Sequence, residues 1–422
     1  MIDFSQVTDI MLGNIPVEQV TDSLGNVLWS GTPVVLPNYF YMEDVSGTAN
    51  TLSIVKENTN APTIEVFVST DTVNWSSMGN TSTTAITATI PANSKLYLKA
   101  TASGWCNIQN YSNRITASGS HNVGGNIMSL LYNDNFENQT AIDVKAFRSL
   151  FYGNNKLVNA NQLVLPATTL ANNCYQQMFR DCTALITTPE LPATTLAQYC
   201  YQYMFQGCTS LTTAPALPAT TLTDNCYYQM FRGCSSLTTA PALPATRLRN
   251  SCYYGMFYSC SSLTTAPALP ATTLAESCYN QMFQNCTALT TAPATLTATT
   301  MYISSCYQMF RNCTSLTTAP ALPATRMEFY CYRGMFQGCT SLTTAPVLPA
   351  TTLDEFCYYN MFNGCTSLNS VTTYADDISA SNCLNNWLNG VAATGDFYNL
   401  GGATYTSGAD GIPTGWTEHN SL

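Results

Sequence analysis

Charged side chains are scarce in this sequence. Asp, Glu, Lys and Arg make up 9% of the 422 residues, and the net charge is −10. The few charges are spread out, so no segment has the character of a basic nucleic-acid-binding arm. Because an acidic chain without a basic surface is repelled by phosphate backbones, we expect no nucleic-acid partner. Thr, Ser, Asn and Gln supply the polarity instead, which suits an extracellular or virion surface.

Long apolar runs are also missing. No stretch of about 18 apolar residues is present, so we expect no membrane span. The stretch MIDFSQVTDIMLGNIPVEQV holds acids but no Lys or Arg, and the first basic residue is Lys56. A secretory signal has a basic start and an unbroken apolar core, and neither is found here. We therefore expect synthesis in a host cytoplasm, where the 18 cysteines stay reduced.

Histidine is almost absent, with His121 and His419 as the two copies. A nucleophilic cysteine requires a nearby base, and neither histidine falls within the cysteine-rich part of the chain. No GxSxG, Walker loop, HExxH or paired-carboxylate motif is present. We expect no enzyme activity, no catalytic residue, no cofactor and no metal.

What the sequence has in abundance is an internal repeat. Cysteines recur with a period of 26 residues, and most are followed by a second cysteine after seven intervening residues. The first series lies at 174, 200, 226, 252, 278, 306, 331, 357 and 383, and the second at 182, 208, 234, 260, 286, 313, 339 and 365. A fixed period in the twenties over eight copies is the mark of a solenoid.

One repeat unit predicts a short helix and a short strand. In TLAESCYNQMFQNC, Cys278, Met282 and Cys286 recur at i, i+4 and i+8, which places them on one apolar stripe of a helix. In LTTAPALPATTL (263–274), Thr favours extended backbone and the prolines exclude helix. Leucines at equivalent positions are expected to stack as two inward ladders. The predicted fold is an α/β solenoid of leucine-rich repeats with one short helix and one short strand per coil.

The sixth copy departs from the pattern. Thr297 stands where other copies have proline, and six residues instead of seven separate Cys306 from Cys313. One insertion before the helix and one deletion inside it predict a local bulge or a slight bend.

The repeat resembles the BspA-type, or Treponema-type, leucine-rich repeat, whose units read LxxLxLPxxLxxIxxxAFxxCxxLxxI. The stretch LPATTLAESCYNQMFQNCTAL (269–289) agrees with this pattern at Leu-Pro, at the Phe and at the following Cys and Leu. It differs in having Met-Phe for Ala-Phe and an additional Cys before the Tyr. The resemblance covers residues 150–390 approximately. It implies adhesion or recognition of the kind found on host-associated bacteria, without a fixed chemistry.

The paired cysteines permit three interpretations. A metal site needs converging thiolates or imidazoles, usually from CxxC spacing, and the repeats contain no histidine. A disulfide within one unit would span about 12 Å along a helix, which is too far, whereas a bridge between equivalent cysteines of adjacent coils is geometrically conceivable. We favour the third interpretation, a small buried apolar side chain.

The first part of the chain predicts two further units. LGNIPVEQVTDSLGNVLW (12–29) resembles the N-terminal segment of structural and fibre proteins from phages of gut Bacteroidales, including crAss-like phages. This resemblance implies that residues 1–31 attach the chain to a particle. Alternating strands in residues 32–115 predict an all-β, immunoglobulin-like sandwich, in which Trp75 and Trp105 are either core anchors or a sugar platform.

Caps are expected at both ends of the repeats. Residues 116–150 are predicted to cover the first open coil of the solenoid, which occupies residues 151–390. Residues 391–422, rich in glycine and aromatic side chains, are predicted to close the other end.

Positions that change from copy to copy flank the apolar stripe, so many of them are expected to reach solvent. The candidate ligand-binding residues are Tyr199, Tyr203, Tyr228, Arg232, Tyr254, Tyr258, Arg311, Tyr330 and Arg333. Exposed Tyr with Arg, Asn and Gln suits glycan recognition through CH–π stacking and hydrogen bonds. The same composition also suits contact with a neighbouring subunit, or ordinary solvated surface.

Three functions are consistent with these features. The first is a non-enzymatic phage fibre or decoration protein on the virion surface, held by other virion proteins through its N-terminus. Its repeats would be displayed toward a host-surface glycan, mucus or a protein receptor. The alternatives are a bacterial cell-surface adhesin and, third, a glycan-degrading spike, which would need clustered acids. By analogy with fibres we expect a homotrimer.

Overall fold

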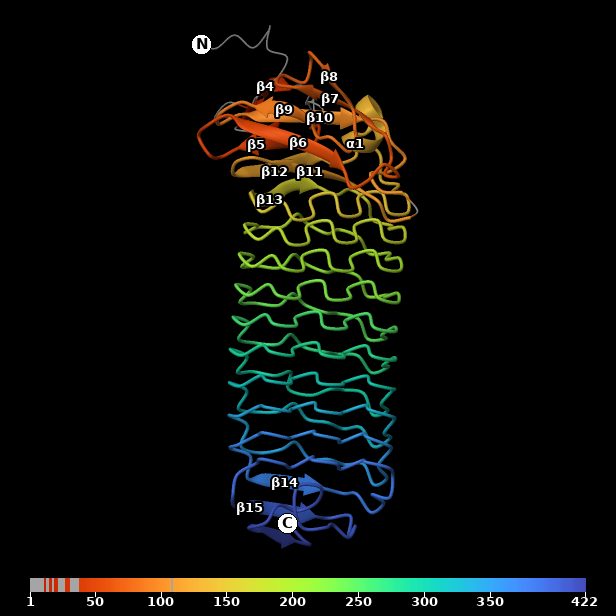
Figure 1. Ribbon diagram of the computed structural model, residues 1–422, viewed down its shortest axis with the longest axis vertical. Coiled ribbons are helices and arrows are strands. Elements are labelled where there is room, and N and C mark those ends of the chain that lie inside the picture. Colours follow the sequence, from red (N-terminus) through yellow and green to blue (C-terminus); the bar gives the residue numbers. More distant parts are fainter. Residues whose placement is uncertain (1–10, 13–14, 17–18, 22–26, 31–37, 108) are drawn as a thin grey trace.

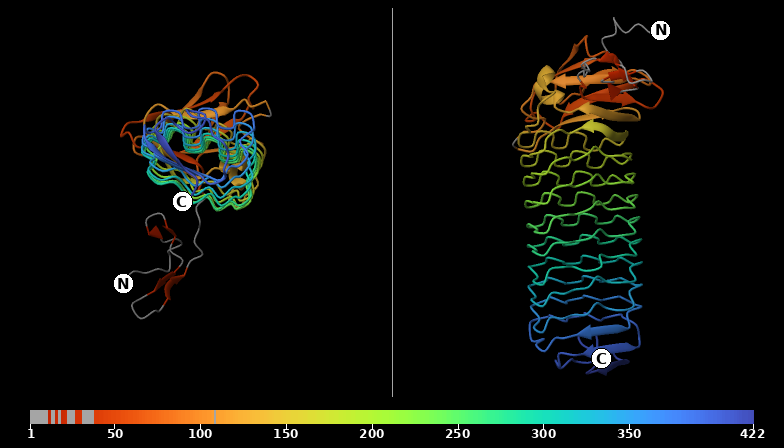
Figure 2. Two further views of the ribbon diagram at one scale, coloured as in Figure 1. Left: turned by 90° about the horizontal axis from the view of Figure 1, so that it is seen from below. Right: turned by 180° about the vertical axis from the view of Figure 1, so that it is seen from behind.

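The computed structural model describes residues 11–12, 15–16, 19–21, 27–30, 38–107 and 109–422. A β-rich domain occupies one end of the molecule, a tall stack of coils forms its body, and a small sheet lies at the other end (Figure 1). Seen along the long axis, the coils lie one behind another (Figure 2). Among the residues given above, no helix is long and apolar enough to cross a membrane.

Four short strands are described near the N-terminus. β1 (Met11–Leu12) pairs antiparallel with β2 (Ile15–Pro16), and β3 (Gln19–Thr21) with β4 (Val27–Ser30). The other residues of the segment 1–31 lie outside the described ones, so its role in particle attachment stays a prediction.

The N-terminal domain contains two sheets. The larger has the strand order β13-β12-β5-β10-β7-β8 and the smaller the order β11-β6-β9. The elements are β5 (Tyr41–Asp44), β6 (Asn50–Lys56), β7 (Glu65–Ser69), β8 (Ser76–Asn80), β9 (Ile86–Ile90), β10 (Lys95–Ala100), β11 (Asn113–Ala117), β12 (His121–Asn126), α1 (Ser129–Tyr132), the 3-10 turn η1 (Asn133–Asn135) and β13 (Leu157–Val164). This arrangement fits the predicted β-sandwich, while its immunoglobulin-like topology stays a prediction.

The two tryptophans of this domain have different environments. Trp105 is fully buried and donates its indole N–H to the Leu130 carbonyl (3.0 Å), which makes it a core residue. Trp75 is half-buried and packs edge-on against Tyr39, with ring centroids 4.8 Å apart. The Lys99 ammonium lies 4.3 Å from the centre of the Trp75 ring, so a cation of the protein already occupies one side of it.

The domain and the repeats share one continuous core. β12 pairs in parallel with β13, so the larger sheet continues into the first coil. His121 on β12 is fully buried, with one ring nitrogen 3.1 Å from the Asn154 amide nitrogen and the other 2.9 Å from the Gly119 carbonyl oxygen. Buried apolar side chains continue from this junction through the whole stack of coils.

Threonines make the parallel contacts between coils. One series of bridges joins Thr213, Thr239, Thr265, Thr291 and Thr318. A second series, on the other side of the proline segment, begins at Thr169, Thr195 and Thr221. The predicted leucine ladders are buried, as Leu263 before the first series and Leu269 between the two series illustrate. Between β13 and β14 (Ser370–Thr373), isolated threonine bridges therefore take the place of the predicted short strand in each coil.

The predicted helix on the other side of each coil is wrong. Residues 277–285 form successive turns instead of a helix. Their backbone N–H groups alternate between two kinds of acceptor. The N–H of Met282 donates within its own coil to Tyr279 O (3.2 Å), and that of Phe283 donates to Met309 O of the next coil (2.9 Å). We call this side of the stack the turn ladder.

Every fourth residue of the turn ladder has left-handed backbone. In one coil, φ is 54° at Ser277, 56° at Gln281 and 63° at Asn285. Such a residue reverses the chain after each turn, which interrupts the run of i→i−4 bonds that a helix requires.

Coil spacing explains why turns replace the helix. An α-helix with its side chains is about 10 Å wide, whereas stacked strands are about 4.8 Å apart. The rings of Phe257 and Phe283 in adjacent coils are stacked with centroids 5.5 Å apart, so the turn side has nearly the spacing of strands. A helix here would force the coils apart. Turns keep the spacing and direct half of their N–H groups to the neighbouring coil.

The predicted deletion in the sixth copy is also wrong. The N–H of Tyr279 donates to Ser305 O (2.8 Å), which occupies the place that a first-series cysteine has in other coils. Ser305 therefore replaces the cysteine, Cys306 replaces the buried tyrosine, and Tyr307 comes to the surface. One additional residue before Leu296 accounts for the irregularity.

Three parallel strands end the stack of coils. They are β14 (Ser370–Thr373), β15 (Gly395–Asn399) and β16 (Trp416–His419). Trp387 lies fully buried beneath them and donates its indole N–H to the Gly411 carbonyl (2.9 Å).

Candidate ligand-binding face

The turn ladder alternates two buried residues with two that face outward. In residues 252–259, Cys-Tyr and Met-Phe are buried, whereas Tyr254 and Tyr258 are half-buried and reach the surface. Because the coils stack in register, equivalent outward residues of successive coils form rows. We call the surface made by these rows the turn face.

Three rows of the turn face vary most. The first row, after the buried tyrosine position, consists of Gln176, Gln202, Tyr228, Tyr254, Asn280, Tyr307, Arg333 and Tyr359. The second row, after the buried phenylalanine, consists of Arg180, Gln206, Arg232, Tyr258, Gln284, Arg311, Gln337 and Asn363. The third row, at the left-handed position before the first-series cysteine, consists of Asn173, Tyr199, Asn225, Ser251, Ser277, Ser304, Tyr330 and Phe356.

Three tyrosines form what we call the tyrosine cluster. Tyr228 and Tyr254 stack with ring centroids 4.7 Å apart, and Tyr203 packs edge-on against Tyr228 at 5.4 Å. Burial raises the pKa of the Tyr228 and Tyr254 hydroxyls, and the neighbouring Tyr203 raises that of Tyr228 further. These hydroxyls therefore stay neutral at physiological pH and both donate and accept hydrogen bonds.

Two arginines lie near the tyrosine cluster. The Arg232 guanidinium lies 4.6 Å from the centre of the Tyr258 ring and donates from Nη1 to Gln229 Oε1 (3.0 Å). The Arg180 guanidinium lies 5.4 Å from the centre of the Tyr203 ring. Such cation–π contacts fix the rings and the cations relative to one another.

A second cluster, which we call the arginine box, lies further along the turn face. Its centre is Arg333, whose guanidinium is 4.4 Å from the Tyr359 ring, 4.8 Å from the Tyr330 ring and 5.7 Å from the Tyr307 ring. Two phenylalanines flank the box. Phe329 and Tyr330 have ring centroids 3.8 Å apart, and Tyr330 and Phe356 have them 5.0 Å apart.

The nine predicted ligand-binding residues all lie half-buried on the turn ladder. The structure brings most of them into one of the two clusters. Within the described part of the chain, Tyr199 and Arg311 have no stacked ring and no cation–π partner. Whether any of the nine binds a ligand stays a prediction.

Four members of the second cluster were not among the predicted site residues. Phe329, Phe356 and Tyr359 vary from copy to copy, so this variability was the signal that would have included them. Tyr307 had no such signal. It follows a cysteine, and every other first-series cysteine except Cys383 is followed by a buried tyrosine. Only the structure shows that the sixth coil is shifted by one residue.

The cysteines are part of the buried core. All eighteen lie within the described residues and are buried free thiols. Burial raises the pKa of the Cys174 and Cys226 thiols to about 12, so these groups are not nucleophilic at neutral pH. Second-series cysteines donate to backbone, as Cys208 Sγ does to Phe179 O (3.1 Å). No group of three His, Cys, Asp or Glu suited to a metal is found in the part of the chain that the structure describes.

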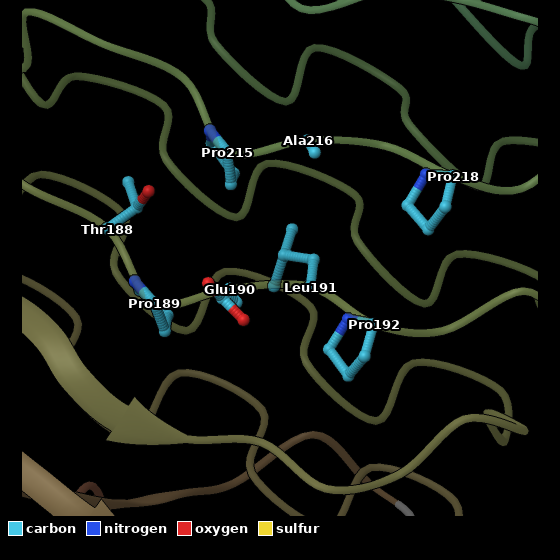
Figure 3. Close-up of a pocket in the computed structure, with 8 residues that line it drawn as sticks. All are labelled: Thr188, Pro189, Glu190, Leu191, Pro192, Pro215, Ala216 and Pro218. Carbon is cyan, nitrogen blue, oxygen red and sulfur yellow. The ribbon is translucent and has the colours of Figure 1, made fainter.

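A shallow apolar groove lies over the proline segments. One hollow of about 380 Å³ is formed by two adjacent coils (Figure 3). Its lining consists of Thr188, Pro189, Glu190, Leu191, Pro192, Pro215, Ala216 and Pro218. A similar hollow of about 510 Å³ lies between Ala294 and Pro349. Glu190 is the one titratable group in either lining, so the groove has no paired acids for hydrolysis.

Stacked coils with buried leucine ladders define a leucine-rich repeat protein. A sequence profile of the BspA type Leucine rich repeat region matches residues 148–290, 217–343 and 276–401, with six copies. Together these matches span more than half of the 422 residues. The chain therefore belongs to the family of BspA-type leucine-rich repeat proteins. This membership supports a surface- or adhesion-type repeat protein.

No curated protein sequence and no solved structure matches the chain. The family and the geometry of the turn face are thus the two sources from which a function is argued.

Proposed function

We propose that this chain is a non-enzymatic adhesion protein of a phage particle, either a fibre or a decoration protein. Its N-terminal segment is held by other virion proteins, and its repeat solenoid is displayed outward on the virion surface, as one subunit of a homotrimer. The turn face binds a glycan of the host surface or of mucus.

The tyrosine cluster is the observation that carries this proposal. Sugar rings present C–H groups that pack on aromatic faces and hydroxyls that need hydrogen-bond partners. Tyr203, Tyr228 and Tyr254 offer both, because their rings are adjacent and each ring carries a hydroxyl. The rings belong to three successive coils, so the cluster can follow a chain of sugars along the stack.

A binding measurement with the full chain tests this proposal. The chain is applied to an array of neutral and acidic glycans, alongside Tyr228→Ala and Tyr254→Ala. We expect each substitution to weaken binding of the captured glycan by about tenfold, because stacking on a desolvated ring contributes on the order of 1 kcal/mol or more.

Tyr374→Ala is the matched control. Tyr374 is exposed and has no stacked ring among the described residues, so its removal leaves binding unchanged. If the cluster variants bind as tightly as the unaltered chain, or if no glycan binds, adhesion through the tyrosine cluster is wrong.

Two alternatives make different predictions. A bacterial cell-surface adhesin carries the same family of repeats but is found on cells, whereas our proposal expects the chain in purified virus particles and a trimer in solution. A glycan-degrading spike would release reducing sugar from a capsular glycan. We expect no such release, because the grooves have no paired acids in their linings.

A further inference from the structure

The arginine box indicates which class of glycan the turn face binds. This inference rests on the proposed adhesion to glycans. Arg333 is the only cation of the first row, in which the other coils have Gln, Asn or Tyr. Its guanidinium lies within 6 Å of three tyrosine rings contributed by three successive coils, at 4.4 Å, 4.8 Å and 5.7 Å. The rings hold the cation in one place on the surface.

The guanidinium of Arg333 has no side-chain acceptor among the residues that the structure describes. Ion pairs of arginine in the described residues involve Arg114 and Arg180. Arg148 and Arg232 donate to glutamine side chains. Arg333, like Arg247, Arg249, Arg311 and Arg326, has no side-chain hydrogen bond and no carboxylate partner in the same part of the chain, but it alone of these five lies against aromatic rings. Its planar set of N–H donors is left for an external anion, which it would bind in bidentate fashion.

The backbone around Arg333 holds two aromatic residues in left-handed conformation. Tyr330 has φ of 60° and Phe356 has φ of 55°, which is left-handed backbone that bulky side chains rarely adopt. The third row elsewhere has Asn or Ser, as at Asn225 and Ser251, with Tyr199 as its one other aromatic residue. Two aromatic residues at strained positions thus lie beside a cation that has no anionic partner. Backbone strain of this kind is typical of functional sites.

We propose that Tyr330, Arg333, Phe356 and Tyr359 form a subsite for an anionic sugar unit. The rings pack against the C–H face of the pyranose, and the guanidinium binds its carboxylate or sulfate group. The net charge of −10 disfavours unspecific attraction of anions, so this subsite is a local exception on an acidic protein.

Direct titration of the full chain tests the subsite. The probes are a galacturonic acid hexamer as the carboxylated glycan, dextran sulfate as the sulfated one, and neutral dextran. We expect Arg333→Gln to weaken binding of at least one anionic probe by about tenfold or more, since a charge-assisted bidentate contact is lost. Binding of neutral glycans stays unchanged. Binding of the anionic probe by the unaltered chain is expected to weaken as NaCl is raised.

Arg326→Thr is the matched control. It removes the same charge from the same coil at an exposed position outside the turn face, where the adjacent coil has Thr352. We expect it to leave the affinity unchanged. The second variant is Tyr359→Asn. Asparagine already stands in the first row at Asn280, so the chain should still fold. We expect this variant to bind the same anionic probe more weakly.

The outcomes separate this inference from the proposed function. If Arg333→Gln binds the anionic probes as tightly as the unaltered chain, or if Arg326→Thr loses as much affinity, the subsite is wrong. If Tyr228→Ala still lost its binding of neutral glycan, the proposed adhesion through the tyrosine cluster would stand. If a folded chain binds neither neutral nor anionic glycans, both proposals fail.

Discussion

Tyr199 shows how the turn ladder constrains a single residue. Its φ of 59° lies in the left-handed region, where a β-carbon approaches the following carbonyl oxygen. The equivalent residues of the two adjacent coils are Asn173 and Asn225, and asparagine tolerates this backbone. Tyr199 has no stacked ring among the described residues, so aromatic packing does not offset the strain.

Replacement of Tyr199 by asparagine is therefore expected to stabilise the protein. We predict that Tyr199→Asn raises the free energy of unfolding by about 1 kcal/mol, because the left-handed strain of a bulky residue is relieved. Urea unfolding followed by tryptophan fluorescence measures the change. The reciprocal substitution Asn225→Tyr should lower the free energy of unfolding by a similar amount. A Tyr199→Asn variant that is less stable than the parent chain would contradict this account.

Each second-series cysteine has a function that a simple apolar residue cannot perform. Cys234 Sγ donates to Phe205 O (3.1 Å), and the same carbonyl accepts the N–H of Cys208 (3.2 Å). The thiol is small enough for the space between coils and also supplies a donor to a buried carbonyl. The sequence predicts the burial of these cysteines. It does not reveal the hydrogen bond, whose acceptor lies 29 residues away in the chain.

At the scale of the element, the apolar spacing of the repeat has two structural solutions. Cys278, Met282 and Cys286 are buried, as the i, i+4, i+8 pattern predicts. A helix of 3.6 residues per turn and a ladder of four-residue turns both place such residues on one side. The pattern therefore predicts the buried face and leaves the backbone undetermined. The signal for turns lies at Ser277 and Gln281, where polar residues recur every fourth position in left-handed backbone.

The same ambiguity limits how much of the candidate site the sequence predicts. Variable positions of the first and second rows are recognised because they flank buried ones, and Tyr228, Tyr254 and Arg333 are found in this way. Their contacts across coils depend on the spacing between coils, which the sequence of one repeat does not contain. Tyr307 is missed because its place depends on a one-residue insertion before Leu296, far from the residue itself.

The turn ladder predicts the far-ultraviolet circular dichroism of the protein. The only α-helix in the described residues is α1, which has four residues. We expect no pair of helical minima at about 208 and 222 nm, because i→i−4 bonds are interrupted at every fourth residue. A helical content of about one fifth, as the predicted short helix in every coil would give, contradicts the turn ladder. The spectrum of the heated, fully unfolded chain is the reference, and the spectrum after cooling shows whether the turn ladder forms again.

For the molecule as a whole, the ladders make stability a shared property of many coils. The rings of Tyr201, Tyr227 and Tyr253 stack with centroids 5.8 Å apart at each step. Each buried tyrosine lies beside the thiol of the first-series cysteine in its own coil. Burial raises the pKa of the Tyr227 hydroxyl well above its usual value. In a stacked array, the contributions of the individual coils to the free energy of unfolding add along the chain, since each coil interacts mainly with its neighbours.

The buried thiols and tyrosine hydroxyls of this ladder predict a loss of stability at alkaline pH. Burial raises the pKa of the Cys174 and Cys226 thiols from 9.0 to about 12. Below pH 9 the folded and unfolded chains both hold these protons, so stability does not depend on them. Above pH 9 the unfolded chain releases protons that the folded chain retains, and the free energy of unfolding falls as pH rises toward 12.

The expected loss is on the order of 1 kcal/mol for each buried thiol at pH 10, and it adds over the coils. Urea midpoints measured in steps between pH 7 and pH 10.5 give the slope, which counts the protons released on unfolding. Cys226→Ala is the internal check, because it removes one titrating thiol and should reduce that slope by about one proton. A midpoint that stays constant from pH 8.5 to pH 10.5 would mean that the thiols are not held in a closed core.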